Sequence, residues 1–91
     1  MKLTSVDLLK MTWAEARKAK YEEGRKLHGP EWVGETRLRE AYVELVDFNV
    51  YIAEAANREE ISRVHASELQ AGAKALADQV RRHIKREDLA K

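Results

Sequence analysis

The chain has no cysteine, one proline and four glycines among its 91 residues. The lack of cysteine excludes disulfides, thiolate nucleophiles and cysteine-based zinc sites, and it is compatible with a reducing cytosol. The proline and three of the glycines lie between residues 24 and 34, so strong helix breakers are almost confined to one stretch. The rest of the sequence is free to form long helices.

A charge excess and a long apolar run are also missing. Seventeen Lys and Arg oppose 16 Asp and Glu, for a net charge of +1. Binding to nucleic acid or to an anionic membrane usually needs a basic excess, so neither partner is expected. No uncharged apolar run approaches the roughly 18 residues of a membrane-spanning helix. Asp7 and Lys10 interrupt the apolar N-terminus, which is unlike a signal peptide. We therefore expect a cytoplasmic protein.

Ala, Leu, Glu, Lys and Arg dominate the remaining sequence, and all of them favour helix. The length fits one all-α domain spanning residues 1–91. Thr4 and Asp7 form a pattern like a capping box, and Thr36 is a suitable N-cap. The pattern predicts three helices, at about residues 5–27, 37–56 and 58–86. In the third, close approach of another helix is predicted at Ala71, Ala73, Ala75 and Ala77.

The second predicted helix is apolar over roughly two-thirds of its circumference, whereas a surface helix needs an apolar arc of about 100°. Two other helices of the same chain could scarcely cover that arc. We therefore predict a helical bundle completed by dimerisation, with an interface at Leu45, Phe48, Asn49 and Ile52. Asn49 has two interpretations: a satisfied buried polar residue, or a residue that sets the register of the dimer.

Acidic residues form a row on the same helix, and this acid row consists of Glu40, Glu44, Asp47 and Glu54. At about 100° per residue, Glu44, Asp47 and Tyr51 fall within roughly 40° of Glu40. Neighbouring carboxylates on a helix repel by tenths of a kcal/mol. The row is either a solvated face or is balanced by a cation or by bases of another helix. Carboxylate oxygens suit Mg²⁺ or Mn²⁺.

The run from Glu44 through Asp47 to Ile52 resembles the E-x-x-D helix of the MazG-like all-α nucleoside triphosphate pyrophosphohydrolases. The preceding stretch, from Gly24 through Leu27-His28-Gly29 to Trp32, is similar to the approach to that helix in small members of the family. The resemblance covers about residues 20–56. The first metal-binding half of the family, E-E-x-x-E, is incomplete, because Lys26 stands at its third acidic position. Either Glu40 compensates, or the site is degenerate and the chain keeps only the fold.

The resemblance implies Mg²⁺-dependent hydrolysis of a nucleoside triphosphate to a monophosphate and pyrophosphate. The implied metal ligands are Glu22, Glu23, Glu40, Glu44 and Asp47, with Glu44 and Asp47 as the catalytic residues. The predicted substrate contacts are Lys26, Trp32, Arg37 and Tyr51. Lys26 and Arg37 would hold phosphate oxygens. Trp32 either stacks on a base or fills the gap between the first two helices.

A second hypothesis is a non-enzymatic dimeric helical adaptor, or a phage-type accessory protein, that uses the same bundle without chemistry. A third is nucleic-acid binding through Arg81 and Arg82, which equally suit the C-terminal end of a helix. Metal dependence separates the first two hypotheses, since only the enzyme is stabilised by Mg²⁺. A steep salt dependence would identify the third.

Overall fold

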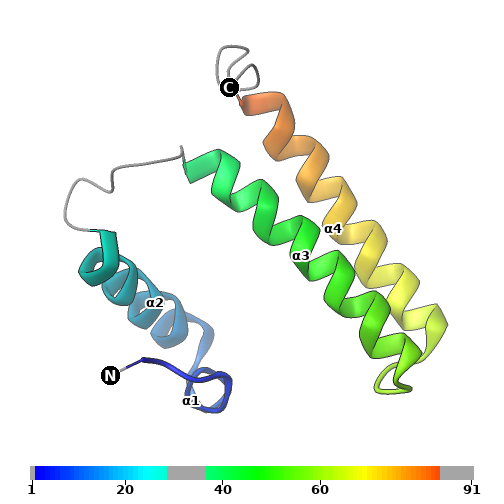
Figure 1. Cartoon of the computed structure of the whole chain (residues 1–91), viewed down its shortest axis with the longest axis horizontal. Coiled ribbons are helices and arrows are strands. Elements are labelled where there is room, and N and C mark those ends of the chain that lie inside the picture. Colours follow the sequence, from blue (N-terminus) through cyan, green and yellow to red (C-terminus); the bar gives the residue numbers. More distant parts are fainter. Residues whose placement is uncertain (1, 29–36, 85–91) are drawn as a thin grey trace. The chain divides into compact units, whose positions relative to one another are not determined.

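The computed structural model describes residues 2–28 and 37–84, and within these ranges the fold is all-α with no strand (Figure 1). The helices are α1 (Ser5–Leu9), α2 (Trp13–His28), α3 (Arg37–Asn57) and α4 (Arg63–His83). They belong to two units, Met1–Gly34 and Glu35–Lys91. The predicted all-α class is confirmed. The prediction of one helix over residues 5–27 is wrong, because this segment forms both α1 and α2.

The break between α1 and α2 comes from a second capping box. The Thr12 N–H donates to Glu15 Oε1 at 2.8 Å, and the Glu15 N–H donates to Thr12 Oγ1 at 3.2 Å. Thr4 and Asp7 exchange the same pair of bonds at 3.0 and 3.1 Å. Each box satisfies amides at a helix start, so the second one begins a new helix at Trp13. The threonine backbone amides lower the pKa of Asp7 and of Glu15 by stabilising the ionised carboxylates.

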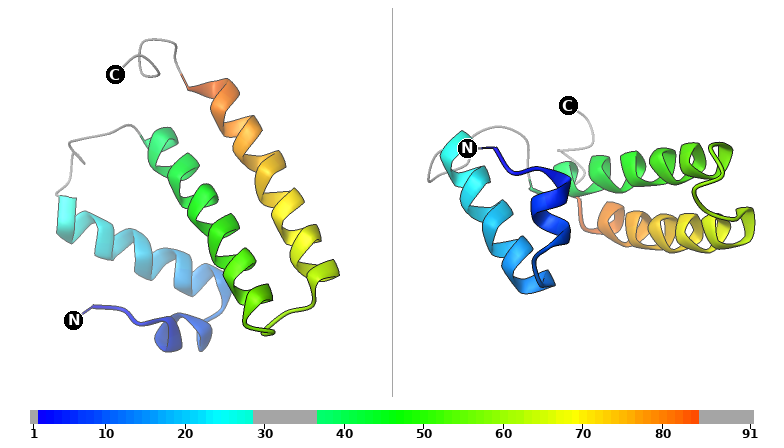
Figure 2. Two further views of the ribbon diagram at one scale, coloured as in Figure 1. Left: turned by 45° about the vertical axis from the view of Figure 1, so that its right-hand side comes forward. Right: turned by 90° about the horizontal axis from the view of Figure 1, so that it is seen from below.

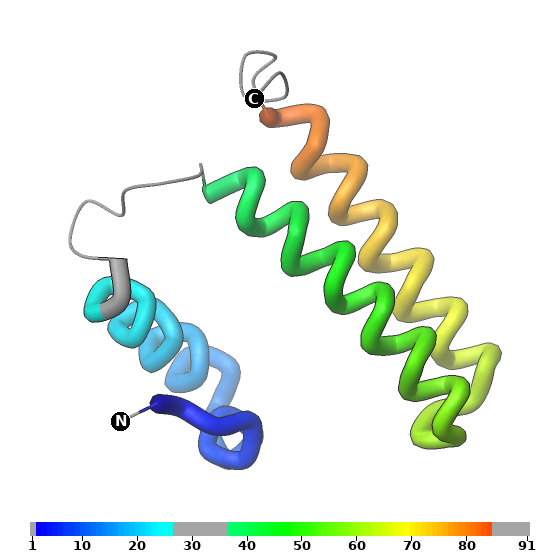
Figure 3. The backbone as a smooth tube through the Cα atoms, in the orientation of Figure 1, coloured from blue at the N-terminus to red at the C-terminus, as the bar shows by residue number. Residues whose placement is uncertain are grey.

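Helices α3 and α4 form a hairpin, in which they lie side by side and run in opposite directions (Figures 2 and 3). The predicted start of the third helix at residue 58 is wrong. Ser62 is the N-cap of α4, because its Oγ accepts the N–H of His65 at 3.2 Å. The helix ends at His83, and Ile84 follows in an extended conformation. The predicted end at residue 86 lies outside the described residues.

The turn of the hairpin is a Schellman motif. The Glu60 N–H donates to the Ala55 carbonyl at 2.9 Å, and the Glu59 N–H donates to the Ala56 carbonyl at 3.1 Å. These two bonds satisfy carbonyls at the end of α3. Glu59 has φ of 62°, the left-handed conformation that glycine usually supplies at this position. The turn therefore holds a glutamate in a backbone conformation that costs about 1–2 kcal/mol for an L-residue.

We expect Glu59→Gly to stabilise the hairpin by about 0.5–1 kcal/mol, because glycine adopts positive φ without this penalty but loses more entropy on folding. Urea denaturation followed by circular dichroism measures the change. Glu60→Gly is the matched control, since Glu60 is not among the described residues with positive φ. Equal effects of the two substitutions would contradict strain at Glu59.

The contact between α3 and α4, called the seam, is filled by small residues. Ala66, Ala73 and Ala77 of α4 are 3, 5 and 8% exposed. Tyr42, Leu45, Asn49 and Ile52 of α3 are half-buried and follow one another at intervals of three or four residues. This spacing is typical of coiled-coil packing, and alanine lets the helices come close. Ala73 and Ala77 thus lie where close approach was predicted, whereas Ala71 and Ala75 are exposed.

Asn49 and Gln70 form a polar bridge across the seam. Asn49 Nδ2 donates to the Gln70 carbonyl at 3.1 Å, and Gln70 Nε2 donates to Asn49 Oδ1 at 3.2 Å and to the Asn49 carbonyl at 3.3 Å. The Asn49 amide is therefore satisfied by its own chain, in agreement with the first of its two interpretations. The bridge fixes the register of α3 against α4, which is the effect of a polar residue within an apolar helix contact.

The seam leaves most apolar side chains of the hairpin uncovered. The three alanines are the only buried residues in the described part of the chain, and no large side chain there is fully buried. Large apolar residues of α3 are between 40 and 71% exposed, namely Leu38, Val43, Val46, Phe48, Val50 and Tyr51. The apolar arc of α3 is thus wider than α4 can cover.

Candidate functional site

The acid row lies on the side of α3 that faces away from α4. Glu40 is nine residues before Asn49, which at about 100° per residue places it on the opposite side of the helix. Glu44 and Asp47 flank that direction and are exposed, as is Tyr51 at 71%. One uninterrupted helix, Arg37–Asn57, holds all of these side chains in a single row. Any opposing wall must therefore come from outside the hairpin.

Basic residues pair with both ends of the acid row. Arg37 Nε lies 3.6 Å from Glu40 Oε2, and Arg58 Nε lies 3.1 Å from Glu54 Oε1. Glu44 and Asp47, in the middle, form no ion pair or hydrogen bond with the side chains that the structure describes. The centre of the row is thus the part that a cation would complement best.

Within residues 2–26 and 37–84, no three acidic or histidine side chains are grouped so that they could hold a metal ion. The i,i+4 pair Glu40 and Glu44 supplies oxygen donors from one side only. Mg²⁺ needs near-octahedral oxygen ligands at about 2.0–2.1 Å, so further donors would have to come from water, substrate or another segment. The Mg²⁺ site therefore stays a prediction.

Glu22 and Glu23, the two metal ligands predicted on α2, have different surroundings. Glu23 is occupied within its own unit: Lys20 Nζ donates to its Oε1 at 2.6 Å, and the Leu3 N–H donates to its Oε2 at 3.0 Å. The Lys20 bond is the main reason why the pKa of Glu23 is lowered. Glu22 is exposed. Because α2 and α3 belong to separate units, a metal site shared by Glu22, Glu23 and the acid row remains a prediction.

The predicted substrate contacts are distributed over both units. Lys26 is exposed on α2, Arg37 pairs with Glu40 on α3, and Tyr51 stands within the acid row. Trp32 lies outside the described residues. Arg37 and Tyr51 share one helix but lie about 21 Å apart along its axis, so the described residues do not bring these contacts together.

The four residues predicted for a dimer interface do not share one environment. Asn49 is used by Gln70 of the same chain, and Leu45 lines a hollow at the seam with Ala73 and Ala77. Ile52 is half-buried, whereas Phe48 is 40% exposed. Of the four, Phe48 is thus the most available to a partner.

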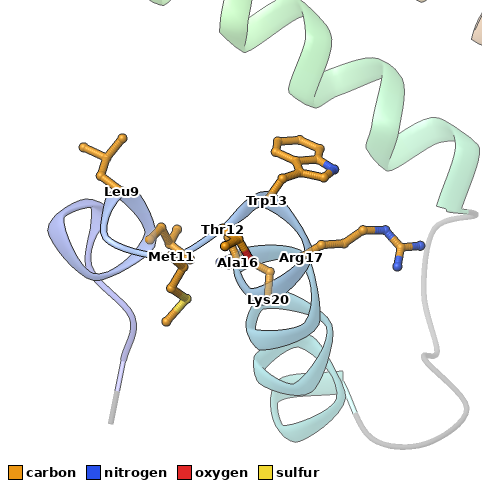
Figure 4. Close-up of a pocket in the computed structure, with 8 residues that line it drawn as sticks. Leu9, Met11, Thr12, Trp13, Ala16, Arg17 and Lys20 are labelled. Atoms are coloured by element: carbon orange, nitrogen blue, oxygen red, sulfur yellow. The ribbon is translucent and has the colours of Figure 1, made fainter.

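An apolar hollow of about 560 Å³ lies between α1 and α2 and was not predicted (Figure 4). Leu9 and Met11 approach it from the end of α1 and the following turn, and Trp13 and Ala16 approach it from α2. Leu9 and Trp13 are both 84% exposed, although they are four residues apart, which is the spacing of one helix face. The sequence feature that indicates the hollow is the Thr12 capping box. It interrupts the helix between Leu9 and Trp13, so the two side chains do not lie on the apolar stripe of a single helix.

Comparison with protein-family models, with curated proteins and with solved structures gives no match to this chain. The resemblance to the MazG-like enzymes accordingly stays a prediction. No helix in the described ranges is long and apolar enough to cross a membrane.

Proposed function

We propose that the chain is a non-enzymatic helical assembly module, in which two α3–α4 hairpins join to complete one bundle. The observation that carries this proposal is the composition of the buried core: three alanines in the described residues, and no fully buried large side chain. Full burial of one Leu, Val or Phe contributes about 1.5–3 kcal/mol, and α3 holds several such side chains half exposed. Association with a second copy would recover this contribution.

Small size supports the same proposal. A domain of about 60 residues buries only about 60% of the surface that its unfolded chain exposes. A helical unit of this kind commonly gains its missing core by oligomerisation. The adaptor hypothesis thus accounts for exposed apolar side chains that a self-sufficient domain would bury.

Melting at several protein concentrations tests the assembly proposal. If folding and dimerisation are coupled, the melting temperature rises by mass action as the protein concentration is raised about a hundredfold. Circular dichroism of the unmodified chain measures it. A melting temperature that does not change with concentration would contradict the proposal.

A metal-dependent pyrophosphohydrolase is the second candidate, favoured by the uncompensated Glu44 and Asp47 and by the resemblance of their segment. In this hypothesis the two carboxylates would hold Mg²⁺ against the triphosphate, and the metal would stabilise the charge that develops on the phosphates. Arg37 adjoins this part of α3 and would contact phosphate oxygens.

For this candidate we expect Mg²⁺ or Mn²⁺ to raise the melting temperature by mass action, and Asp47→Asn to remove the increment. Glu68→Gln on α4 is the control, because it removes an exposed acid outside the acid row. Release of pyrophosphate from a panel of nucleoside triphosphates measures the activity. The enzyme hypothesis fails if the metal has no effect and Asp47→Asn stabilises the chain by tenths of a kcal/mol through relief of repulsion.

A further inference from the structure

The hairpin has two broad faces, one on each side of the seam. On the first, Val46 and Val50 line a hollow of about 250 Å³ together with Lys74 and Asp78. Lys74 Nζ lies 2.9 Å from Asp78 Oδ2, and by helical spacing Arg63 and Arg81 lie on the same side of α4. This face is therefore charged.

The second face is apolar in its middle, and His65 and His83 lie at its two ends on α4. At about 100° per residue, the side of each helix that lies across the seam from the charged face holds residues without a formal charge. Called the Phe48 face, it consists of Leu45, Phe48, Ile52, Leu69, Gly72, Leu76 and Val80. Phe48, Leu69 and Leu76 are 40, 42 and 53% exposed. A face without Lys, Arg, Asp or Glu can be removed from water at little electrostatic cost.

Gly72 leaves open space on this face. It stands in the interior of α4, where glycine weakens a helix relative to alanine. A Cβ atom at Gly72 would meet nothing within 4 Å, so packing inside the hairpin does not require glycine there. Glycine at such a position leaves the backbone of α4 accessible to a group from outside the hairpin.

The surroundings of Gly72 form a hole for a large side chain. Leu69, Gly72 and Leu76 are exposed at i, i+3 and i+7, and the buried Ala73 at i+4 closes the hole on the side of the seam, so that the four have the spacing that receives one knob in coiled-coil packing. The small residues Gly72 and Ala73 form the bottom of this hole, and Leu69 and Leu76 form its sides. Phe48 lies at the same level of the hairpin, because its neighbour Asn49 bonds to Gln70 and lines a hollow with Ala73.

We propose that a second copy of the chain docks on the Phe48 face, and that Phe48 of each copy fills the hole at Gly72 of the other. A two-fold axis parallel to the helices places α3 of one copy over α4 of its partner, at matching levels. Helices α3 and α4 are each about 30 Å long and about 10 Å wide, so the Phe48 face has an area of roughly 600 Å². This area reaches the lower range of stable interfaces, about 600–1,000 Å² per partner. The proposal rests on the assembly function and specifies its site.

Size exchange between Phe48 and Gly72 tests the proposal. Sedimentation equilibrium of the full chain should give a dimer dissociation constant that rises roughly thirtyfold or more with Phe48→Ala, as for an anchor residue. Gly72→Leu, which fills the hole, should weaken the dimer similarly. The double variant should recover most of the affinity, because the introduced leucine side chain would occupy the space that Phe48 leaves. Ala71→Leu, an exposed neighbour on α4, is the control and should leave the dimer unchanged.

The outcomes separate this site from the assembly function. A wild-type chain that is monomeric at every concentration overturns both. A wild-type dimer that tolerates Phe48→Ala and Gly72→Leu keeps the assembly function and overturns the Phe48 face. Loss of dimer in both single variants without recovery in the double variant overturns the contact of Phe48 with Gly72. Circular dichroism of each variant verifies that the helices are retained.

Discussion

Ala73→Leu is expected to lower the free energy of unfolding of the hairpin by about 1–3 kcal/mol. Ala73 is 5% exposed and lines the seam beside Leu45 and Asn49 of α3. Three additional carbon atoms at this position would force α3 and α4 apart or push the leucine into a strained rotamer. Separation of the helices would also break the Asn49–Gln70 bridge. Urea denaturation at fixed protein concentration measures the loss.

Ala75→Leu is the matched control for this substitution. Ala75 is two residues along the same helix and is exposed, so a leucine there should change stability by no more than about 0.5 kcal/mol. If Ala73→Leu changes the free energy of unfolding no more than Ala75→Leu does, the helices do not pack closely through alanine.

Asn49→Ala is expected to destabilise the hairpin by about 1–2 kcal/mol, because it removes two side-chain hydrogen bonds and leaves the Gln70 amide with fewer partners. The bridge is only partly buried, so water can replace some of the lost bonds, which limits the cost. Gln70→Ala should cost a similar amount.

A double-mutant cycle isolates the bond between the two side chains, Gln70 Nε2 to Asn49 Oδ1, because the other two bonds of the bridge end on backbone carbonyls. If the two side chains interact directly, the double variant loses less stability than the two single variants together, by about 0.5–1.5 kcal/mol. Asn57→Ala is the control, since Asn57 is an exposed asparagine at the end of the same helix. Strict additivity of Asn49→Ala and Gln70→Ala would mean that the bond between the two side chains contributes nothing to stability.

The all-α class followed from composition, because helix formers fill the chain outside one breaker-rich stretch. The division of the first helix did not follow, although its signal is present: Thr12 and Glu15 have the spacing of a capping box. The apolar residues on both sides of Thr12 continue a helical period, and that period concealed the break. Likewise Ser62 competes with an unbroken run of helix formers and determines where α4 begins.

The seam was only partly predictable. Val64, Leu69 and Leu76 are large apolar residues of α4, yet they are 70, 42 and 53% exposed. The contact uses alanines in their place, because the Asn49–Gln70 bridge selects one register and small residues allow the closest approach. Helical spacing defines the angle between side chains but does not identify which side meets a neighbour.

The acid row followed from spacing on a single helix, and α3 is continuous over its whole length. Its chemistry could not follow in the same way. A metal site needs ligands from several directions, and the residues facing Glu44 and Asp47 would have to come from another segment or another copy. Charge spacing within one helix carries no information about that second wall.

Sedimentation equilibrium of the unmodified chain measures whether the hairpin, held by an alanine seam, completes its core with a second copy. We expect a mass twice the 10.5 kDa of one chain, with dissociation only on dilution. A species of 10.5 kDa across the whole concentration range, with its helices intact, would contradict it.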